Sequence, residues 1–108
     1  MYLTGIADEA SQDGNVQIST TQAMGWNAIE ARCLNGKNLH DVSDSEFDEF
    51  RRALEQANVY VNAFGSAIAN WGKDVRDDFS ITLDEVDRAI PRMHALQAKI
   101  VRIMSYKV

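Results

Sequence analysis

Cysteine is scarce in this sequence, where Cys33 is the single one among 108 residues. A lone cysteine can form no intramolecular disulfide bond and cannot build a zinc site by itself. We therefore expect Cys33 to be a small, buried, apolar side chain in a reducing compartment. Long apolar runs are also missing, since none approaches the ~18 residues that a membrane span requires, and residues 1–5 lack the features of a secretion signal. These absences predict a cytoplasmic protein with no membrane partner.

Basic residues are few as well. The 11 Lys and Arg residues stand against 16 Asp and Glu residues, for a formal net charge of −5 at pH 7. Domains that bind nucleic acid normally carry a basic surface, so we expect no nucleic-acid partner. Apolar residues make up 45% of the chain and charged residues 25%. This composition is typical of a globular domain and excludes an intrinsically disordered chain.

Short apolar runs alternate with helical patterns along the chain. The apolar runs span residues 2–7, 27–34, 59–64 and 100–104, and the helical patterns begin near residues 16, 44 and 83. Residues 35–38, Asn-Gly-Lys-Asn, predict a turn. The order of elements is therefore β-α-β-α-β-α-β. Strands that alternate with helices imply right-handed crossovers and a parallel sheet, so we expect an α/β fold built from parallel βα units.

Capping signals mark the second and third helices. Ser43 and Glu46 form a capping box, in which the serine side chain bonds forward and the glutamate side chain reaches back. Thr82 and Glu85 offer the same box for the third helix. Pro91 lies inside that helical pattern and removes one backbone donor, so we expect a kink or a break in the residues just before it.

Charged residues interrupt two of the expected strands. A buried parallel strand should be an almost continuous apolar run, yet Glu30 and Arg32 lie in the second run and Arg102 lies in the fourth. Because buried charge is costly unless it is paired or solvated, we expect all three to line a polar cavity at the carboxyl ends of the strands, where parallel α/β proteins place their sites. The alternative is a Glu30–Arg32 or Glu30–Arg102 ion pair with no chemical role.

Two further features bear on function. The loop after the third run, residues 65–73, is long for a compact domain, and long loops often carry function. Neither His40 nor His94 has a carboxylate or a second histidine at the spacing of metal ligands, so we expect both histidines at the surface. The sequence therefore predicts no metal site within these residues.

Four motifs resemble, in order along the chain, those of one known family. They are Asp-Glu-Ala-Ser-Gln-Asp at residues 8–13, Ile-Glu-Ala-Arg at 29–32 with Gly-Lys-Asn at 36–38, Ser-Ala-Ile at 66–68 followed by Lys73, and Arg-Ile-Met-Ser-Tyr at 102–106. The family is the sugar phosphate isomerase/epimerase family of xylose isomerase-like TIM barrels. The resemblance extends across the whole chain.

This resemblance implies the N-terminal half of a TIM (β/α)8 barrel, with residues 1–108 as one partial domain of four strands and three helices. A full barrel needs about 250 residues and eight strands. The implied parent enzyme interconverts isomers of a sugar or sugar phosphate by enediol proton transfer or hydride shift, with a divalent metal (Mg, Mn, Zn or Co) polarising the oxygens. The family's metal ligands lie on later strands. Catalytic and metal-binding residues are therefore expected beyond Val108, and the 108 residues alone are expected to be inactive.

Six residues are expected to bind the substrate: Glu9, Glu30, Arg32, Ser66, Lys73 and Arg102. The guanidinium groups would hold hydroxyl or anionic groups through paired hydrogen bonds, and the carboxylates would position the substrate. The alternative for the two arginines is an ion pair with Glu9 or Glu30. The alternative for Lys73 is a solvated loop lysine.

Two other functions stay open on the sequence. The first is a non-catalytic half-barrel, whose open strand edges and exposed apolar area predict self-association. The second is an abasic-site endonuclease of the same fold, against which the lack of a basic surface counts.

Overall fold

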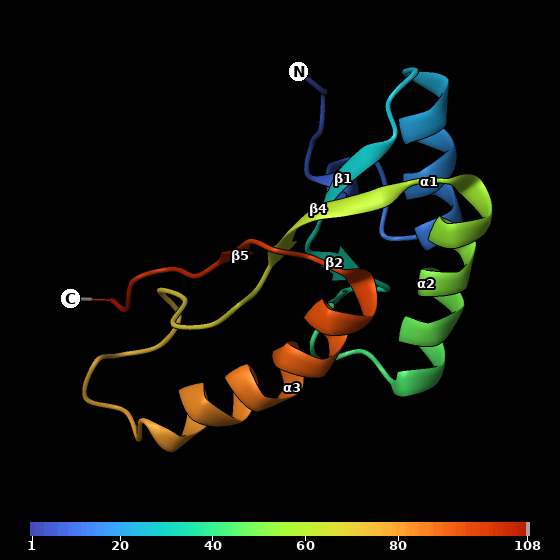
Figure 1. Ribbon diagram of the computed structural model, residues 1–108. Coiled ribbons are helices and arrows are strands. Elements are labelled where there is room, and N and C mark those ends of the chain that lie inside the picture. Colours follow the sequence, from blue (N-terminus) through green and yellow to red (C-terminus); the bar gives the residue numbers. More distant parts are fainter. Residues whose placement is uncertain (108) are drawn as a thin grey trace.

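The computed structural model describes residues 1–107 (Figure 1). Its helices are the short 3-10 helix η1 (Ala7–Glu9), α1 (Gly14–Ala23), α2 (Asp44–Ala57) and α3 (Ser80–Leu96). Its strands are β1 (Ala28–Ala31), β2 (Cys33–Leu34), β3 (Lys37–Asn38), β4 (Tyr60–Gly65) and β5 (Val101–Arg102). No helix in this described part is long and apolar enough to cross a membrane.

A parallel sheet with the strand order β1-β4-β5 forms the centre of the fold. β1 pairs with β4 along its whole length, from Ala28 to Ala31. β5 pairs with the carboxyl end of β4, where Gly65 lies opposite Arg102. Helices α2 and α3 connect these strands, as parallel pairing requires a crossover. The parallel α/β architecture expected from the sequence is confirmed.

The apolar run at residues 2–7 does not form the full first strand that the sequence predicts. Ile6 makes a single parallel bridge with Glu30, and the Glu30 N–H group donates to the Gly5 carbonyl at 2.9 Å. The chain then turns into η1, where the Ala10 N–H group donates to the Ala7 carbonyl at 3.1 Å. The strand is short because this local turn takes up the carbonyl that would otherwise continue the ladder.

All three α-helices pack on one side of the sheet, as Figure 1 shows. The hydrophobic core lies between the two layers and includes Ile29 of β1 and Phe64 of β4. Phe47, Phe50 and Leu54 of α2 join it, and their spacing of three and four residues is the apolar stripe that the sequence shows. In the described residues no α-helix covers the opposite face of the sheet, where the short helix η1 contributes Asp8 and Glu9.

Local signals in the sequence define the start of α2 and the β2–β3 hairpin. Ser43 Oγ accepts from Glu46 N–H at 3.2 Å, and Glu46 Oε2 accepts from Ser43 N–H at 3.0 Å, so the predicted capping box is confirmed. Asn35 and Gly36 have positive φ angles of 53° and 79° in the turn between β2 and β3. This is the conformation that Asn-Gly favours in a two-residue hairpin turn.

α3 departs from its predicted start, and of the kink or break expected before Pro91 the break does not occur. Phe79 precedes the helix without a side-chain capping bond, and Thr82 lies inside the helix. The Thr82 hydroxyl instead hydrogen-bonds Tyr106, a residue 24 positions away. The helix also runs through Pro91 without a break. Proline removes only one backbone bond, and the burial of Ala89 in the core holds the preceding turn in place.

Candidate functional site

The open face of the sheet, opposite the helices, carries the charged residues of the strands. Ala31 belongs to the core on the helix side. Because side chains alternate along a strand, its neighbours Glu30 and Arg32 lie on the other face. Arg102 Nε lies 3.6 Å from Glu30 Oε1, so Arg102 shares that face. Glu30, Arg32 and Arg102 thus lie together, away from the α-helices, and the Glu30–Arg102 ion pair that the sequence left open is formed. Their role in lining a polar cavity stays a prediction.

Gly65 separates the two arginines. It is the last residue of β4, and a Cβ atom at this position would lie 3.0 Å from Arg32 Cβ and 3.3 Å from Arg102 Nη2. Both distances are tighter than ordinary van der Waals contact. Because Gly65 has no side chain, the arginine side chains of the two neighbouring segments, Arg32 and Arg102, can both lie over the end of β4.

Arg32 is bound tightly to the acidic residues of η1. Its Nε and Nη2 atoms donate to both carboxylate oxygens of Asp8, at 2.9 and 2.7 Å, and Nη2 also donates to Glu9 Oε1 at 3.0 Å. The Asp8 side chain is only 2% exposed, whereas that of Glu9 is 71% exposed. The hydrogen bond to Asp8 raises the pKa of Arg32. Sequence reasoning chose Glu9 as a site residue and missed Asp8, although both stand at the end of the first apolar run.

Glu30 and Arg102 form a looser pair. Beyond the 3.6 Å contact between them, the buried atoms Glu30 Oε1, Arg102 Nε and Arg102 Nη2 have no hydrogen-bond partner among the described residues. Buried polar atoms normally have such partners. Within this pair Glu30 Oε1 and Arg102 Nε face each other, so Arg102 Nη2 is the buried donor that lacks a partner among the described residues.

Ser66 and Lys73 belong to the loop between β4 and α3, and the side chain of each has partners outside this loop. Ser66 is fully buried, and its Oγ donates to the Arg102 carbonyl at 2.6 Å. Lys73 Nζ forms an ion pair with Glu85 of α3 and donates to the Ala67 carbonyl at 3.1 Å. The structure thus brings Ser66 beside the backbone of Arg102 and holds Lys73 against α3. The substrate-binding roles of both residues stay predictions.

His40 lies in the interior, so its predicted surface position is wrong. It belongs to the β3–α2 loop and is 1% exposed. Its ring lies against the start of the β4–α3 loop, where Nε2 accepts from Ala67 N–H at 3.2 Å. The sequence gives little sign of this, because the partner is 27 residues away.

Cys33 is partly buried, and desolvation raises the pKa of its thiol to about 11. It is therefore a poor nucleophile at neutral pH.

The described residues contain no group of three or more His, Cys, Asp or Glu that could hold a metal ion. The carboxylates of the open face also contact guanidinium groups: Asp8 and Glu9 bond to Arg32, and Glu30 pairs with Arg102. The carboxylates of Asp8, Glu9 and Glu30 therefore do not form a site that fits a divalent metal.

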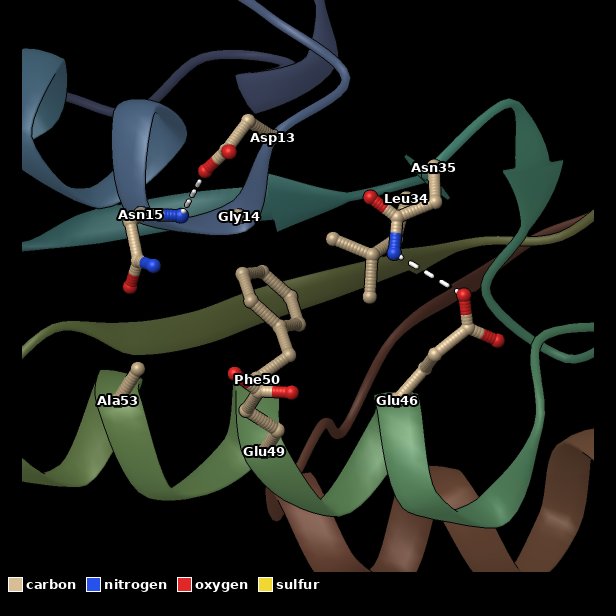
Figure 2. A pocket seen from close by; sticks show the side chains of 9 residues that line it. All are labelled: Asp13, Gly14, Asn15, Leu34, Asn35, Glu46, Glu49, Phe50 and Ala53. Carbon is tan, nitrogen blue, oxygen red and sulfur yellow. Dashed lines mark hydrogen bonds between the residues drawn. The ribbon is translucent and has the colours of Figure 1, made fainter.

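A small pocket of about 430 Å³ lies on the helical side of the molecule, away from this charged face. Figure 2 shows that it is bounded by the first turn of α1, the turn after β2 and one side of α2. Its polar groups bond to one another: Asp13 Oδ1 accepts from Asn15 N–H at 2.8 Å, and Asn35 Nδ2 donates to Glu46 Oε1 at 3.1 Å. These polar groups are occupied by bonds at the starts of α1 and α2. The open face of the sheet is therefore the better candidate site.

Comparison of the sequence with protein families and with curated proteins finds no match. Solved structures that share the fold include the following two. One is a xylose isomerase-like TIM barrel protein from Mycobacterium smegmatis in complex with magnesium, with a TM-score of 0.70, 17% identity, and coverage of 99% of this chain and 38% of that chain. The other is D-psicose 3-epimerase in the presence of D-fructose, with a TM-score of 0.64, 14% identity, and coverage of 95% and 37%.

The chain has part of the TIM-barrel fold of these proteins. It spans 38% and 37% of their lengths, which agrees with the expectation that it forms part of a barrel. The resemblance to xylose isomerase-like barrels is therefore confirmed at the level of the fold. The open face of the sheet corresponds to the interior of a TIM barrel, whose helices form the outer ring.

Proposed function

We propose that this chain supplies part of the substrate site of a sugar isomerase or epimerase. The observation that carries the proposal is the polar face made by Glu30, Arg32 and Arg102 at the carboxyl ends of parallel strands, where TIM barrels place their active sites. Two structures of the same fold support it, since one of them is an epimerase with a sugar present. The substrate is a sugar or a sugar phosphate.

The open face binds the substrate and orients it. Other parts of the barrel carry out the chemistry of isomerisation. Arg102 Nη2 is a buried donor without a partner among the described residues, and the Glu30–Arg102 contact is loose at 3.6 Å, so we assign the substrate hydroxyl groups to this pair. Asp8 fixes Arg32 in one orientation through paired bonds, and Glu9 lies at the exposed rim. A divalent metal (Mg, Mn, Zn or Co) would supply polarisation of the substrate oxygens, and the residues that would hold it are expected outside these strands.

A nuclear magnetic resonance titration of the 108-residue chain with D-fructose tests this proposal. We expect sugar-dependent shifts to concentrate at the amides of Glu30, Arg32 and Arg102. Arg102→Met should weaken the affinity about tenfold, because one charge-assisted hydrogen bond contributes ~1.5 kcal/mol. A parallel titration with D-fructose 6-phosphate distinguishes a sugar from a sugar phosphate.

Arg51→Met is the matched control, because Arg51 lies on α2 and pairs with Asp48 and Glu55 on the outer surface. It should leave the affinity unchanged. Shifts confined to the helical surface, or no shifts with either sugar, would overturn the proposal.

A further inference from the structure

The backbone of Ala67 is bonded at both its N–H group and its carbonyl by ionisable side chains. Its N–H group donates to His40 Nε2 at 3.2 Å, and its carbonyl accepts from Lys73 Nζ at 3.1 Å. Ala67 follows Ser66, which bonds to the backbone of Arg102 on the open face. The position of Ala67 therefore decides how the β4–α3 loop leaves the sheet next to the candidate site.

The bonds made by His40 require one protonation state. Because Nε2 accepts a hydrogen bond from Ala67, it carries no proton, and the ring proton must lie on Nδ1. Nδ1 then donates to Asp41 Oδ1, 3.2 Å away. The neutral ring satisfies both contacts. A proton on Nε2 would place one N–H donor against another.

Charged groups from three segments surround this ring. Asp41 belongs to the same loop as His40 and also accepts from Arg88 of α3 at 2.9 Å. Glu85 of α3, paired with Lys73 of the β4–α3 loop, acts on His40 as a second negative charge. The two carboxylates favour a charged ring, whereas Arg88 opposes it.

Burial decides between these influences. The His40 side chain is completely enclosed, and desolvation lowers its pKa below the ordinary value despite the attraction of Asp41 and Glu85. The ring is therefore neutral at pH 7, which is the state that its bond to Ala67 requires.

We propose that neutral His40 is a positioning residue that holds the β4–α3 loop against the sheet, and that protonation of its Nε2 atom in acid releases Ala67. Other bonds keep the release local. The segment after β5 runs beside the loop (Figure 1), where Met104 N–H donates to the Ile68 carbonyl and Lys107 N–H to the Lys73 carbonyl. Acid thus loosens the start of the loop, next to Ser66, and leaves its remainder attached.

Nuclear magnetic resonance on the whole chain tests this inference without any measurement of activity. As the pH is lowered from about 7 to about 4, the hydrogen-exchange protection factor of the Ala67 amide should fall about tenfold. The midpoint should match the titration of the His40 ring and lie below the ordinary histidine pKa of about 6.5.

His40→Gln is the conservative variant, since its Oε1 offers an acceptor near the position of Nε2 that acid does not protonate. It should keep Ala67 protected at every pH and abolish the acid step. His94→Gln is the matched control on the exposed histidine, and it should leave the step in place.

Several results would overturn the inference: an acid step that persists in His40→Gln, a step lost in His94→Gln, or Ala67 protection that does not change with pH. If His40→Gln fails to fold, the unaltered chain decides alone. Different midpoints for the His40 ring and the Ala67 amide would then refute the link between them.

Discussion

Arg32 and Arg102 lie on the same face of the sheet but differ in how completely they are bonded. Arg32 is held by Asp8 and Glu9, whereas Arg102 has one distant partner in Glu30. A buried carboxylate is tolerated only when paired, because desolvation of a lone charge is costly. At the scale of the residue, the Asp8–Arg32 pair is therefore structural support, and the looser Glu30–Arg102 pair is the one to which the proposed function assigns the substrate.

Asp8→Asn should lower the free energy of unfolding by about 1–3 kcal/mol, since it removes the charge that neutralises Arg32 in a partly buried position. Urea denaturation provides the measurement. Glu9→Gln is the matched control, because Glu9 is largely exposed, and it should change the free energy by less than about 0.5 kcal/mol. Equal losses in the two variants would contradict the division of roles between Asp8 and Glu9.

Helix starts differ in how much they depend on local sequence. α2 begins where Ser43 and Glu46 satisfy each other's backbone groups, a reciprocal bond that requires only neighbouring residues. α3 begins without such a bond, because Thr82 and Glu85 contact Tyr106 and Lys73 instead. At the scale of the element, the same sequence pattern gives a cap in one helix and tertiary contacts in the other.

Ser43→Ala should lower the free energy of unfolding by about 1 kcal/mol, because it removes the acceptor for the Glu46 N–H group. Thermal denaturation followed by circular dichroism measures the loss. Ser45→Ala alters an exposed serine in the first turn of the same helix, and it should be nearly neutral. An unchanged melting temperature in Ser43→Ala would show that packing alone sets the start of α2.

The sheet has open edges at the scale of the whole molecule. Among the described residues, β5 pairs with β4 on one side only, and β1 is covered on its other side by no more than the single bridge to Ile6. Ile100 and Ile103 beside β5 are 59% and 62% exposed. Unpaired backbone groups next to exposed apolar side chains favour pairing with another strand.

We therefore expect the 108-residue chain to self-associate, with a sedimentation coefficient that rises with protein concentration. Ile103→Lys should weaken this association about tenfold or more, because a charge at a strand edge opposes pairing. Val16→Lys, at an exposed position of α1, is the control and should leave the association unchanged. A monodisperse monomer at all concentrations would refute the expectation.

The candidate site was only partly visible in the sequence. Glu30, Arg32 and Arg102 stood out because a charge inside an apolar strand is unusual and alternation along the strand assigns its face. Asp8 and His40 did not stand out. Their roles depend on partners 24 and 27 residues away, and no local pattern reports such contacts. The same reason explains the misplaced start of α3.

Local chemistry in the sequence alone determined the alternation of strands and helices, the parallel sheet, the capping of α2 and the Asn35-Gly36 turn. These features depend on periodicity and on bonds between near neighbours. Only the tertiary structure decided which charges are paired, which are free, and that a histidine holds the β4–α3 loop. Pairing and burial depend on distances between segments that are remote in the chain, and a pattern of residue types does not contain those distances.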